Sequence, residues 1–273
     1  MLKFLYDTFP GRVILKTLTK PAISKMCGAF LETRLSKVLI PPFVYANAID
    51  LSECFASDFK CFNDCFARRM RPGKRVFDMN PSAFCAPCDG LLTVYEITPD
   101  LVISVKHSRY DLVRLLHSRK LADRYAGGYC LVFRLCVDNY HRYSYIDKGS
   151  KGVNHFIPGK LHTVQPIALE RIPVFTENSR EFTVMNTENF GKIVQMEVGA
   201  MLVGKIHNHH GRHNFLRGQE KGFFKYGGST IIVLVEKGRV VLDDKILKAS
   251  AEEVETPVKL GEKIGNGWSL FRR

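Results

Sequence analysis

The chain has 273 residues, 45% of them hydrophobic, so it can bury a substantial core in one large domain or two unequal ones. Its formal net charge of +13 indicates an anionic partner: nucleic acid, an anionic membrane surface or an acidic substrate. Eight irregularly spaced cysteines are too few for a disulfide scaffold of this size, and no secretory leader is recognisable, so we expect a reducing, cytosolic compartment.

Residues 1–47 are predicted to be helical, because apolar and basic side chains alternate there with a helical period. The apolar set includes Phe4, Leu5, Phe9, Val13, Ile14, Leu18 and Ile23, and the basic set Lys3, Arg12, Lys16, Lys20 and Lys25. Basic amphipathic helices are typical of the membrane headgroup region, but helices that pack on a soluble core share the period, so both interpretations stay open. The longest apolar run, 38–46, contains two prolines and is too short to span a bilayer.

A second helical stretch is predicted over 49–72, followed by a change to short strands. Its aromatic side chains recur every three or four residues, at Phe55, Phe59, Phe62 and Phe66, which predicts one buried helix face. Pro72 and Gly73 would end this helix. We therefore place a domain boundary near residue 75, between a helical, basic membrane-association region (1–75) and a β-rich domain (76–273).

The rest of the chain is rich in residues that favour strands. The predicted strands are 91–97, 101–105, 129–137, 182–186, 192–198, 200–206, 230–235 and 240–242. One short helix is predicted over 110–125, where Gly127 and Gly128 end it. Helices segregated from strands along the chain predict an α+β fold.

Three segments of the β-rich part carry side chains suited to chemistry. Asp89 and Gly90 precede a predicted strand, where Asp-Gly usually marks a turn. His141 follows the strand predicted to end at residue 137, and its neighbours Asp, Tyr and Arg could tune it as an acid or base. Ser229 follows two glycines and leads into an apolar strand, a pattern that most often marks a tight turn.

Together these residues have the types that nucleophilic catalysis needs. A serine nucleophile requires a base and a carboxylate that orients the base, which His141 and Asp89 could supply to Ser229. Gly227 and Gly228 lack a Cβ, so the backbone there can adopt strained dihedrals that bring the Ser229 hydroxyl to the Gly228 carbonyl. An ordinary serine hydrolase is disfavoured, because this serine precedes a strand and lacks the Gly-x-Ser-x-Gly elbow.

Several motifs, taken together, resemble the phosphatidylserine decarboxylases. They are Phe59-Lys60-Cys61-Phe62-Asn63-Asp64, Arg71-Pro72-Gly73, Pro87-Cys88-Asp89-Gly90, Tyr140-His141-Arg142, His162-Thr163-Val164-Gln165-Pro166, Phe175-Thr176-Glu177-Asn178-Ser179-Arg180, the segment 198–206 and Gly227-Gly228-Ser229-Thr230. Each is weak alone, but their order over nearly the whole chain is specific. The Gly-Gly-Ser-Thr form and the His-Thr-Val segment resemble the branch called type II.

The resemblance implies a self-processing enzyme that converts phosphatidylserine to phosphatidylethanolamine and carbon dioxide. It implies autocatalytic serinolysis between Gly228 and Ser229, giving a large β chain (1–228) and a small α chain (229–273) that stay together as a heterodimer and could assemble further. Ser229 would become a covalent pyruvoyl group, the electron sink of the reaction, with no dissociable cofactor. Asp89 would orient the base, and His141 would be that base or the proton donor. Barrel-sandwich-like sheets and a peripheral position on the cytoplasmic face of the membrane are also implied.

Three positions depart from the family pattern. Ser144 stands where many members carry a second histidine, so both histidine roles could fall to His141, or His162 could take one of them. Asn139 stands where an acid is common and Gln165 where an asparagine is common. Both substitutions keep hydrogen-bonding capacity.

Two other functions remain as alternatives. A metal-binding protein could use the side chains of Cys85, Cys88, His207, His209, His210 and His213. However, a single Cys-x-x-Cys pair is weak support, and a histidine-rich loop is more often a solvated turn. A nucleic-acid-binding module would suit the charge, but no recognised module or basic-aromatic signature is present in the sequence.

Overall fold

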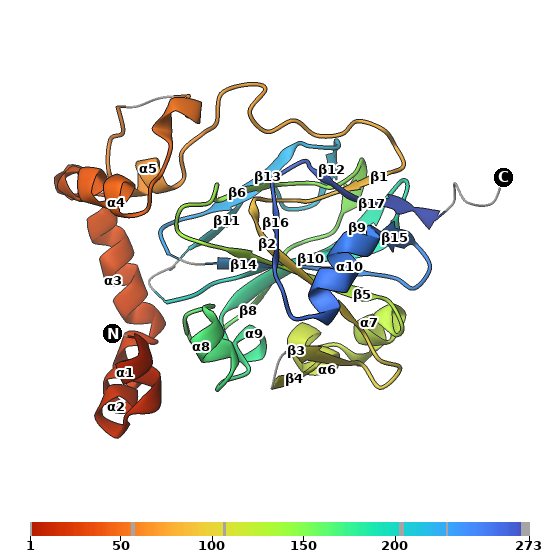
Figure 1. Cartoon of the computed structure of the whole chain (residues 1–273), viewed down its shortest axis with the longest axis horizontal. Helices are drawn as coiled ribbons and strands as arrows, with labels where there is room; N and C mark the ends of the chain where they lie inside the picture. Colours follow the sequence, from red (N-terminus) through yellow and green to blue (C-terminus); the bar gives the residue numbers. More distant parts are fainter. Residues whose placement is uncertain (1, 56–57, 106–107, 202–204, 228, 269–273) are drawn as a thin grey trace.

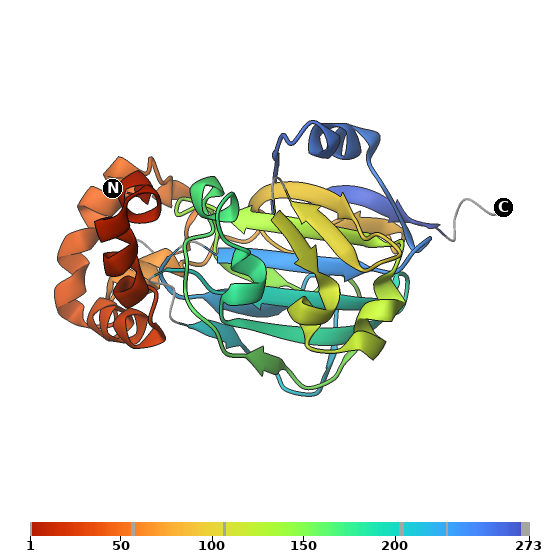
Figure 2. The same cartoon turned by 90° about the horizontal axis from the view of Figure 1, so that it is seen from below.

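The computed structural model describes residues 2–55, 58–105, 108–201, 205–227 and 229–268. Its first part is helical. The elements there are α1 (Leu2–Asp7), α2 (Phe9–Leu18), α3 (Pro21–Leu31), the 3-10 helix η1 (Arg34–Leu39), α4 (Ile40–Ala46), the 3-10 helix η2 (Leu51–Glu53) and α5 (Phe62–Phe66). Figure 1 and Figure 2 both show these helices at one end of the molecule, beside the strands rather than stacked on them.

The helical prediction for 1–47 is confirmed, and local sequence explains where each helix starts. The Thr8 hydroxyl accepts a hydrogen bond from the Gly11 amide at 3.1 Å and caps α2. Pro21 begins α3, where the missing N–H of proline costs nothing. None of the helices in the described part of the chain is long and apolar enough to cross a membrane.

The single helix predicted over 49–72 is wrong. The chain folds back on itself through α5, so that residues on its two sides pair: the Phe55 amide bonds to the Arg69 carbonyl at 2.8 Å, and the Arg71 amide bonds to the Glu53 carbonyl at 2.8 Å. A continuous helix cannot make these pairs. As a result Phe55 is 71% exposed, although the other three phenylalanines of the predicted face are buried.

The remaining elements are mostly strands. They are β1 (Ala83–Cys85), β2 (Gly90–Glu96), β3 (Val102–Val105), β4 (Ser108–Asp111), β5 (Tyr129–Leu135), β6 (Arg142–Ser144), β7 (Gly149–Lys151), β8 (His155–Ile157), β9 (Arg180–Thr187), β10 (Gly191–Val198), β11 (Ile206–Asn208), β12 (His213–Phe215), β13 (Glu220–Phe224), β14 (Ser229–Val235), β15 (Val240–Leu242), β16 (Thr256–Val258) and β17 (Lys263–Gly267). Short helices connect them: α6 (Leu112–Leu116), α7 (Arg119–Ala122), η3 (Asp123–Tyr125), α8 (Pro166–Leu169), α9 (Val174–Glu177) and α10 (Asp244–Ala251).

The strands form an open set of antiparallel sheets, so the α+β prediction is confirmed. Within the described residues, the largest sheet has nine strands, in the order β12-β7-β9-β10-β14-β5-β2-β16, with β8 added on β9. Smaller sheets have the orders β1-β17-β15, β11-β13-β6 and β3-β4. No pairing among the described residues joins the two ends of the large sheet, so it is not a closed barrel.

Strand β14 lies near the middle of this large sheet. All seven of its residues are buried, and β5 and β10 flank it. Its continuous apolar run, Ile231–Val235, is typical of a strand covered on both faces. The strand predicted over 230–235 is therefore confirmed and begins one residue earlier, at Ser229.

Three other predicted elements differ from the structure. The helix predicted over 110–125 is broken at His117, whose φ of 51° is left-handed, because Asp111 and Ser118 each cap a separate short helix. The strand predicted to reach residue 137 ends at Leu135. Of the strand predicted over 200–206, residues 200–201 are not in a strand, 202–204 lie outside the described residues, and β11 starts at Ile206.

Candidate active site

The segments that carry Asp89, His141 and Ser229 meet at one edge of the large sheet. Ser229 begins β14, Asp89 directly precedes β2, and His141 follows the end of β5. Because β5 lies between β2 and β14 and runs antiparallel to both, its end lies beside the starts of the other two. Residues far apart in the sequence are thus brought to the same end of three neighbouring strands.

Two backbone contacts join the His141 segment to the Ser229 segment. Ser229 is the register partner of Leu135, the last residue of β5. The Phe224 amide donates a hydrogen bond to the His141 carbonyl at 3.0 Å. Two loops therefore lie side by side at both of their ends: Leu135 is beside Ser229, and His141 is beside Phe224.

Several buried polar atoms at this edge have no hydrogen-bond partner within the described residues, among them Ser229 Oγ, His141 Nε2 and Thr230 Oγ1. Ser229 and His141 have no exposed surface, and neither Ser229 Oγ nor His141 Nε2 has a hydrogen-bond partner among the described residues. An unpaired buried polar group costs about 1–3 kcal/mol, so each such group needs an explanation, and a catalytic role is one of them. Gly228, where the predicted cleavage falls, lies outside the described residues.

The surroundings of His141 keep its ring neutral. Its Nδ1 lies 2.9 Å from the Asn139 carbonyl, and its ring packs on Phe66 with centroids 4.0 Å apart. Burial, together with the charge of Arg68, lowers the pKa of His141 to about 3, although the Asn139 carbonyl opposes this shift. A carbonyl can only accept a hydrogen bond, so Nδ1 carries the proton and Nε2 is free to accept one.

Arg68 fixes the segment that leads to His141. Its Nη2 donates to the carbonyls of Asp138 at 2.5 Å and Asn139 at 3.2 Å. Arg68 follows α5, the helix whose last residue, Phe66, packs on the His141 ring. One short stretch of chain therefore supplies both an apolar cover and a cation to this histidine.

Asp89 is engaged by other partners. Arg75 donates to the Asp89 carboxylate from Nε at 2.8 Å and from Nη2 at 2.7 Å, and the Leu260 amide donates at 2.9 Å. Arg75 also contacts Glu53 at 3.2 Å. The hydrogen bond between Asp89 and His141 that the predicted orienting role requires is not among the contacts of the described residues.

His162 lies on the other side of β14. Asn178 Nδ2 donates at 2.8 Å to the carbonyls of both His162 and Gly199, and Gly199 directly follows β10, whose last residue pairs with Thr230. The His162 Nδ1 faces the Tyr6 hydroxyl of α1 at 3.4 Å. Burial lowers the pKa of His162. No described contact joins it to Ser229 or His141.

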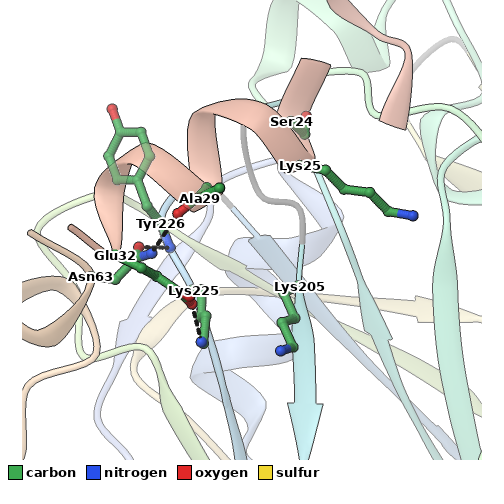
Figure 3. A pocket seen from close by; sticks show the side chains of 9 residues that line it. Ser24, Lys25, Ala29, Glu32, Asn63, Lys205, Lys225 and Tyr226 are labelled. Atoms are coloured by element: carbon green, nitrogen blue, oxygen red, sulfur yellow. Dashed lines mark hydrogen bonds and ion pairs between the residues drawn. The ribbon is translucent and has the colours of Figure 1, made fainter. Parts of the chain in front are cut away.

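A pocket of about 390 Å³ lies beside the turn that leads to Ser229 (Figure 3). It is lined by Ser24, Lys25, Gly28, Ala29, Glu32, Asn63, Lys205, Lys225 and Tyr226. Asn63 joins the two sides of the pocket, because its Oδ1 accepts from the Tyr226 amide at 3.2 Å and its Nδ2 donates to the Gly28 carbonyl at 3.4 Å. No pattern in the sequence predicted that Lys205 and Lys225 share a pocket; the one available signal was the position of Lys225 next to Tyr226-Gly227.

The metal-binding alternative is not supported. Within the part of the chain that the structure describes, no group of three His, Cys, Asp or Glu side chains could hold a metal ion. Cys85 and Cys88 lie in separate apolar clusters, and burial raises the pKa of both thiols. In the histidine-rich segment, His209 contacts Glu220 at 2.6 Å, whereas His210 and His213 stack on each other.

Comparison with known proteins adds independent information. The family model described as phosphatidylserine decarboxylase matches residues 62–266, which include the three segments of the sheet edge. The chain is 45% identical over 265 residues to phosphatidylserine decarboxylase proenzyme 2 of Clostridium acetobutylicum, covering 97% of this chain and 91% of that protein. With the same coverage, it is 40% identical to a phosphatidylserine decarboxylase proenzyme of Ruminiclostridium cellulolyticum and 36% identical to one of Desulfitobacterium hafniense.

Proposed function

Because the chain belongs to the phosphatidylserine decarboxylase family and is thus a carboxy-lyase, we propose that it converts phosphatidylserine to phosphatidylethanolamine with a pyruvoyl group made from its own Ser229. The relatives are named as proenzymes, which supports a processing step. The observation that carries the proposal is that Ser229 Oγ and His141 Nε2, at one edge of the sheet, are both buried without a partner among the described residues.

In the proposed processing, His141 Nε2 takes the proton of the Ser229 hydroxyl. The oxygen attacks the Gly228 carbonyl carbon, the amide C–N bond breaks, and the freed nitrogen of Ser229 takes up a proton, leaving an ester. Removal of the Ser229 α-proton then expels the Gly228 carboxylate and cuts the chain. Water finally displaces ammonia from the new terminus and leaves the pyruvoyl carbonyl. A neutral ring with a free Nε2 suits the first transfer.

In the proposed decarboxylation, the group at position 229 supplies an electron sink for the bond to the departing carbon dioxide. His141 would then deliver a proton to the substrate carbon. The Phe66 ring packed on His141 excludes water from this side of the site, which favours conversion of a charged carboxylate to neutral carbon dioxide. His162 is the alternative imidazole for one of the two proton transfers.

Asp89 has a supporting place in this proposal. Its carboxylate, held by Arg75 and the Leu260 amide, fixes the start of β2 beside the end of β5. If Asp89 also orients an imidazole during processing, its bond to Arg75 must first rearrange.

The N-terminal helices support a membrane surface as partner. Apolar side chains are exposed on α2, α3 and η1, at Phe9, Val13, Ile14, Met26, Phe30, Leu35 and Val38. Basic side chains occur between them, at Arg12, Lys16, Lys20 and Lys25. This combination suits the interface of an anionic membrane, where each lysine or arginine contributes about 1 kcal/mol. We propose peripheral attachment at the cytoplasmic face.

Intact-mass measurement on the purified protein tests the proposal. We expect two pieces, 1–228 and 229–273, with a blocked N-terminus on the smaller one. Ser229→Ala should remain one uncut, inactive chain, whereas the control Ser150→Ala, on β7 outside the site, should be cut normally. An active preparation that contains only full-length chain with unmodified Ser229 would contradict the proposal.

A further inference from the structure

Two lysines lie opposite each other at the end of a strand pair beside the site. Ile206 of β11 pairs with Phe224 of β13, and the Lys225 amide donates to the Lys205 carbonyl at 3.2 Å, which extends the pairing by one position. Directly opposed residues of antiparallel strands project to the same face, and like charges there destabilise the pair. Figure 3 shows both side chains extending in the same direction from the two strands.

The lining of the pocket does not balance this charge. Glu32 of α3 forms an ion pair with Lys225, and the pKa of Glu32 is lowered by Lys225 and Lys205. Lys25 adds a third cation, and within the described residues neither Lys25 nor Lys205 has an ion-pair partner. The lining thus holds more cations than carboxylates, and Lys205 and Lys225 extend together while the Lys25 side chain extends away from them (Figure 3), so the paired lysines suit an incoming anion.

The pocket adjoins an apolar groove. Tyr226 lines both, and the groove, of about 610 Å³, is otherwise lined by Met26, Cys27, Phe30, Leu31, Leu39, Phe43 and Phe62. Tyr226 is fixed by the bond of its amide to Asn63 and by edge-to-face packing on Phe62. A cationic pocket and an apolar groove on either side of one fixed ring match a molecule with an anionic head and an apolar tail.

We propose that Lys205 and Lys225 bind the phosphodiester of the phospholipid substrate, an inference that rests on the proposed function. The substrate amine must reach position 229, and the carboxylate leaves as carbon dioxide. The phosphodiester is thus the anion that persists from substrate to product. Lys225 lies four residues before Ser229, so a phosphate held there stays near the reacting end of the headgroup. Glu32 competes with the phosphodiester for Lys225.

The first test is binding without turnover. Calorimetry on the purified protein measures the affinity for glycerophosphoethanolamine, the deacylated product. Lys205→Met and Lys225→Met should each weaken binding roughly ten- to a hundredfold, the range expected for loss of a hydrogen bond to a charged group. Lys263→Met, at an exposed position of β17, removes the same net charge and should leave affinity within about twofold. Glu32→Gln should tighten binding, because it removes the competing carboxylate.

The second test is kinetic. With a short-chain, water-soluble phosphatidylserine, the two pocket variants should raise KM with little change in kcat, because the phosphodiester is bound equally before and during reaction. Lys205→Arg, which keeps the charge, should restore most of the affinity. Intact mass should show normal cleavage in every variant.

The possible results distinguish a failure of the proposed phosphodiester subsite from a failure of the proposed function. Normal cleavage with unchanged affinity in both pocket variants, or an equal loss in Lys263→Met, overturns the subsite and leaves the proposed function. A chain that never cleaves overturns the function, whereas the calorimetry still reports on the pocket because it needs no pyruvoyl group. Binding of inorganic phosphate that is tighter than that of glycerophosphoethanolamine assigns the pocket to free phosphate and overturns the proposal.

Discussion

The two imidazoles on either side of β14 are both buried but have different contacts. His141 has no exposed surface, packs on an aromatic ring, and keeps an unpartnered Nε2 within the described residues. His162 is 6% exposed, lines an open pocket of about 570 Å³ beside α2, and faces the Tyr6 hydroxyl. From this comparison we expect His141 to exchange a proton and His162 to hold α1 against the sheets.

The largest expected difference is in self-cleavage. His141→Ala should slow the cut by about 10²–10⁴-fold, the usual contribution of a general base, because His141 is the proposed base and its segment meets Ser229 at the sheet edge. His162→Ala should be cut at close to the normal rate. Time-resolved intact mass after expression measures both rates, with His155→Ala, an exposed histidine of β8, as control. Normal cleavage and normal turnover in His141→Ala would exclude this histidine from the mechanism. His162 would then be the next imidazole to test.

The second difference is in the pH dependence of stability. The folded chain holds His141 neutral, with a pKa of about 3, whereas the unfolded chain binds a proton near pH 6.5. As the pH falls, the unfolded state therefore binds the proton before the folded state does. The contribution of His141 to the free energy of unfolding is fully present above about pH 6.5. It is lost as the pH falls toward 3, by up to about 1.4 kcal/mol per pH unit.

Urea unfolding of the uncut Ser229→Ala protein at several pH values measures this slope. Adding His141→Gln should flatten the slope between pH 6.5 and 4. Adding His162→Gln should have a smaller effect, because His162 is less buried and its pKa is less depressed. Equal flattening by both substitutions would mean that the two rings do not differ as the structure indicates.

The third difference concerns the cation near His141. Arg68→Met should destabilise the protein by about 1–3 kcal/mol, since two carbonyls next to the histidine lose their donor. It should also raise the pKa of His141, because one cause of its depression is removed. NMR titration of the imidazole measures the pKa, and the exposed control Arg109→Met should leave it unchanged. An unaltered pKa in Arg68→Met would show that burial alone sets it.

The smallest effect is expected on the side of His162. Tyr6→Phe removes the hydroxyl that faces His162 and that accepts from the Thr163 amide at 3.2 Å. We expect a loss of about 0.5–1.5 kcal/mol in unfolding free energy and no change in cleavage. A large loss of cleavage in Tyr6→Phe would instead give His162 a part in the chemistry.

The strands around the site were predictable because their sequences are long, apolar and β-branched. The run Ile231–Val235 could hardly form anything but a buried strand, and the helical period of residues 1–47 was equally strong. In the stretch 49–72, however, the helical spacing of apolar residues predicted the wrong structure. Its phenylalanine spacing imitates a helix, but the tertiary pairing of Cys54 with Met70 bends the chain back and leaves Phe55 outside.

The sequence predicted which residue types form the candidate site, but not the contacts between them. Residue order suggested that Asp89, His141 and Ser229 act together, and the sheet does bring their segments to one edge. That Arg75 binds Asp89 depends on a loop contact without a periodic signal. The pairing of Lys205 with Lys225 depends on the register of two short strands, which no local pattern encodes.

The position of β14 in the large sheet determines what a cut before Ser229 would leave behind. The piece from 229 onward contributes β14, held between β5 and β10, but also β16 on β2 and β17 on β1. The two products would thus be interleaved in two sheets, so neither could depart without dismantling both. Separation of the fragments would amount to denaturation, and a freshly made terminus would stay anchored where it was formed.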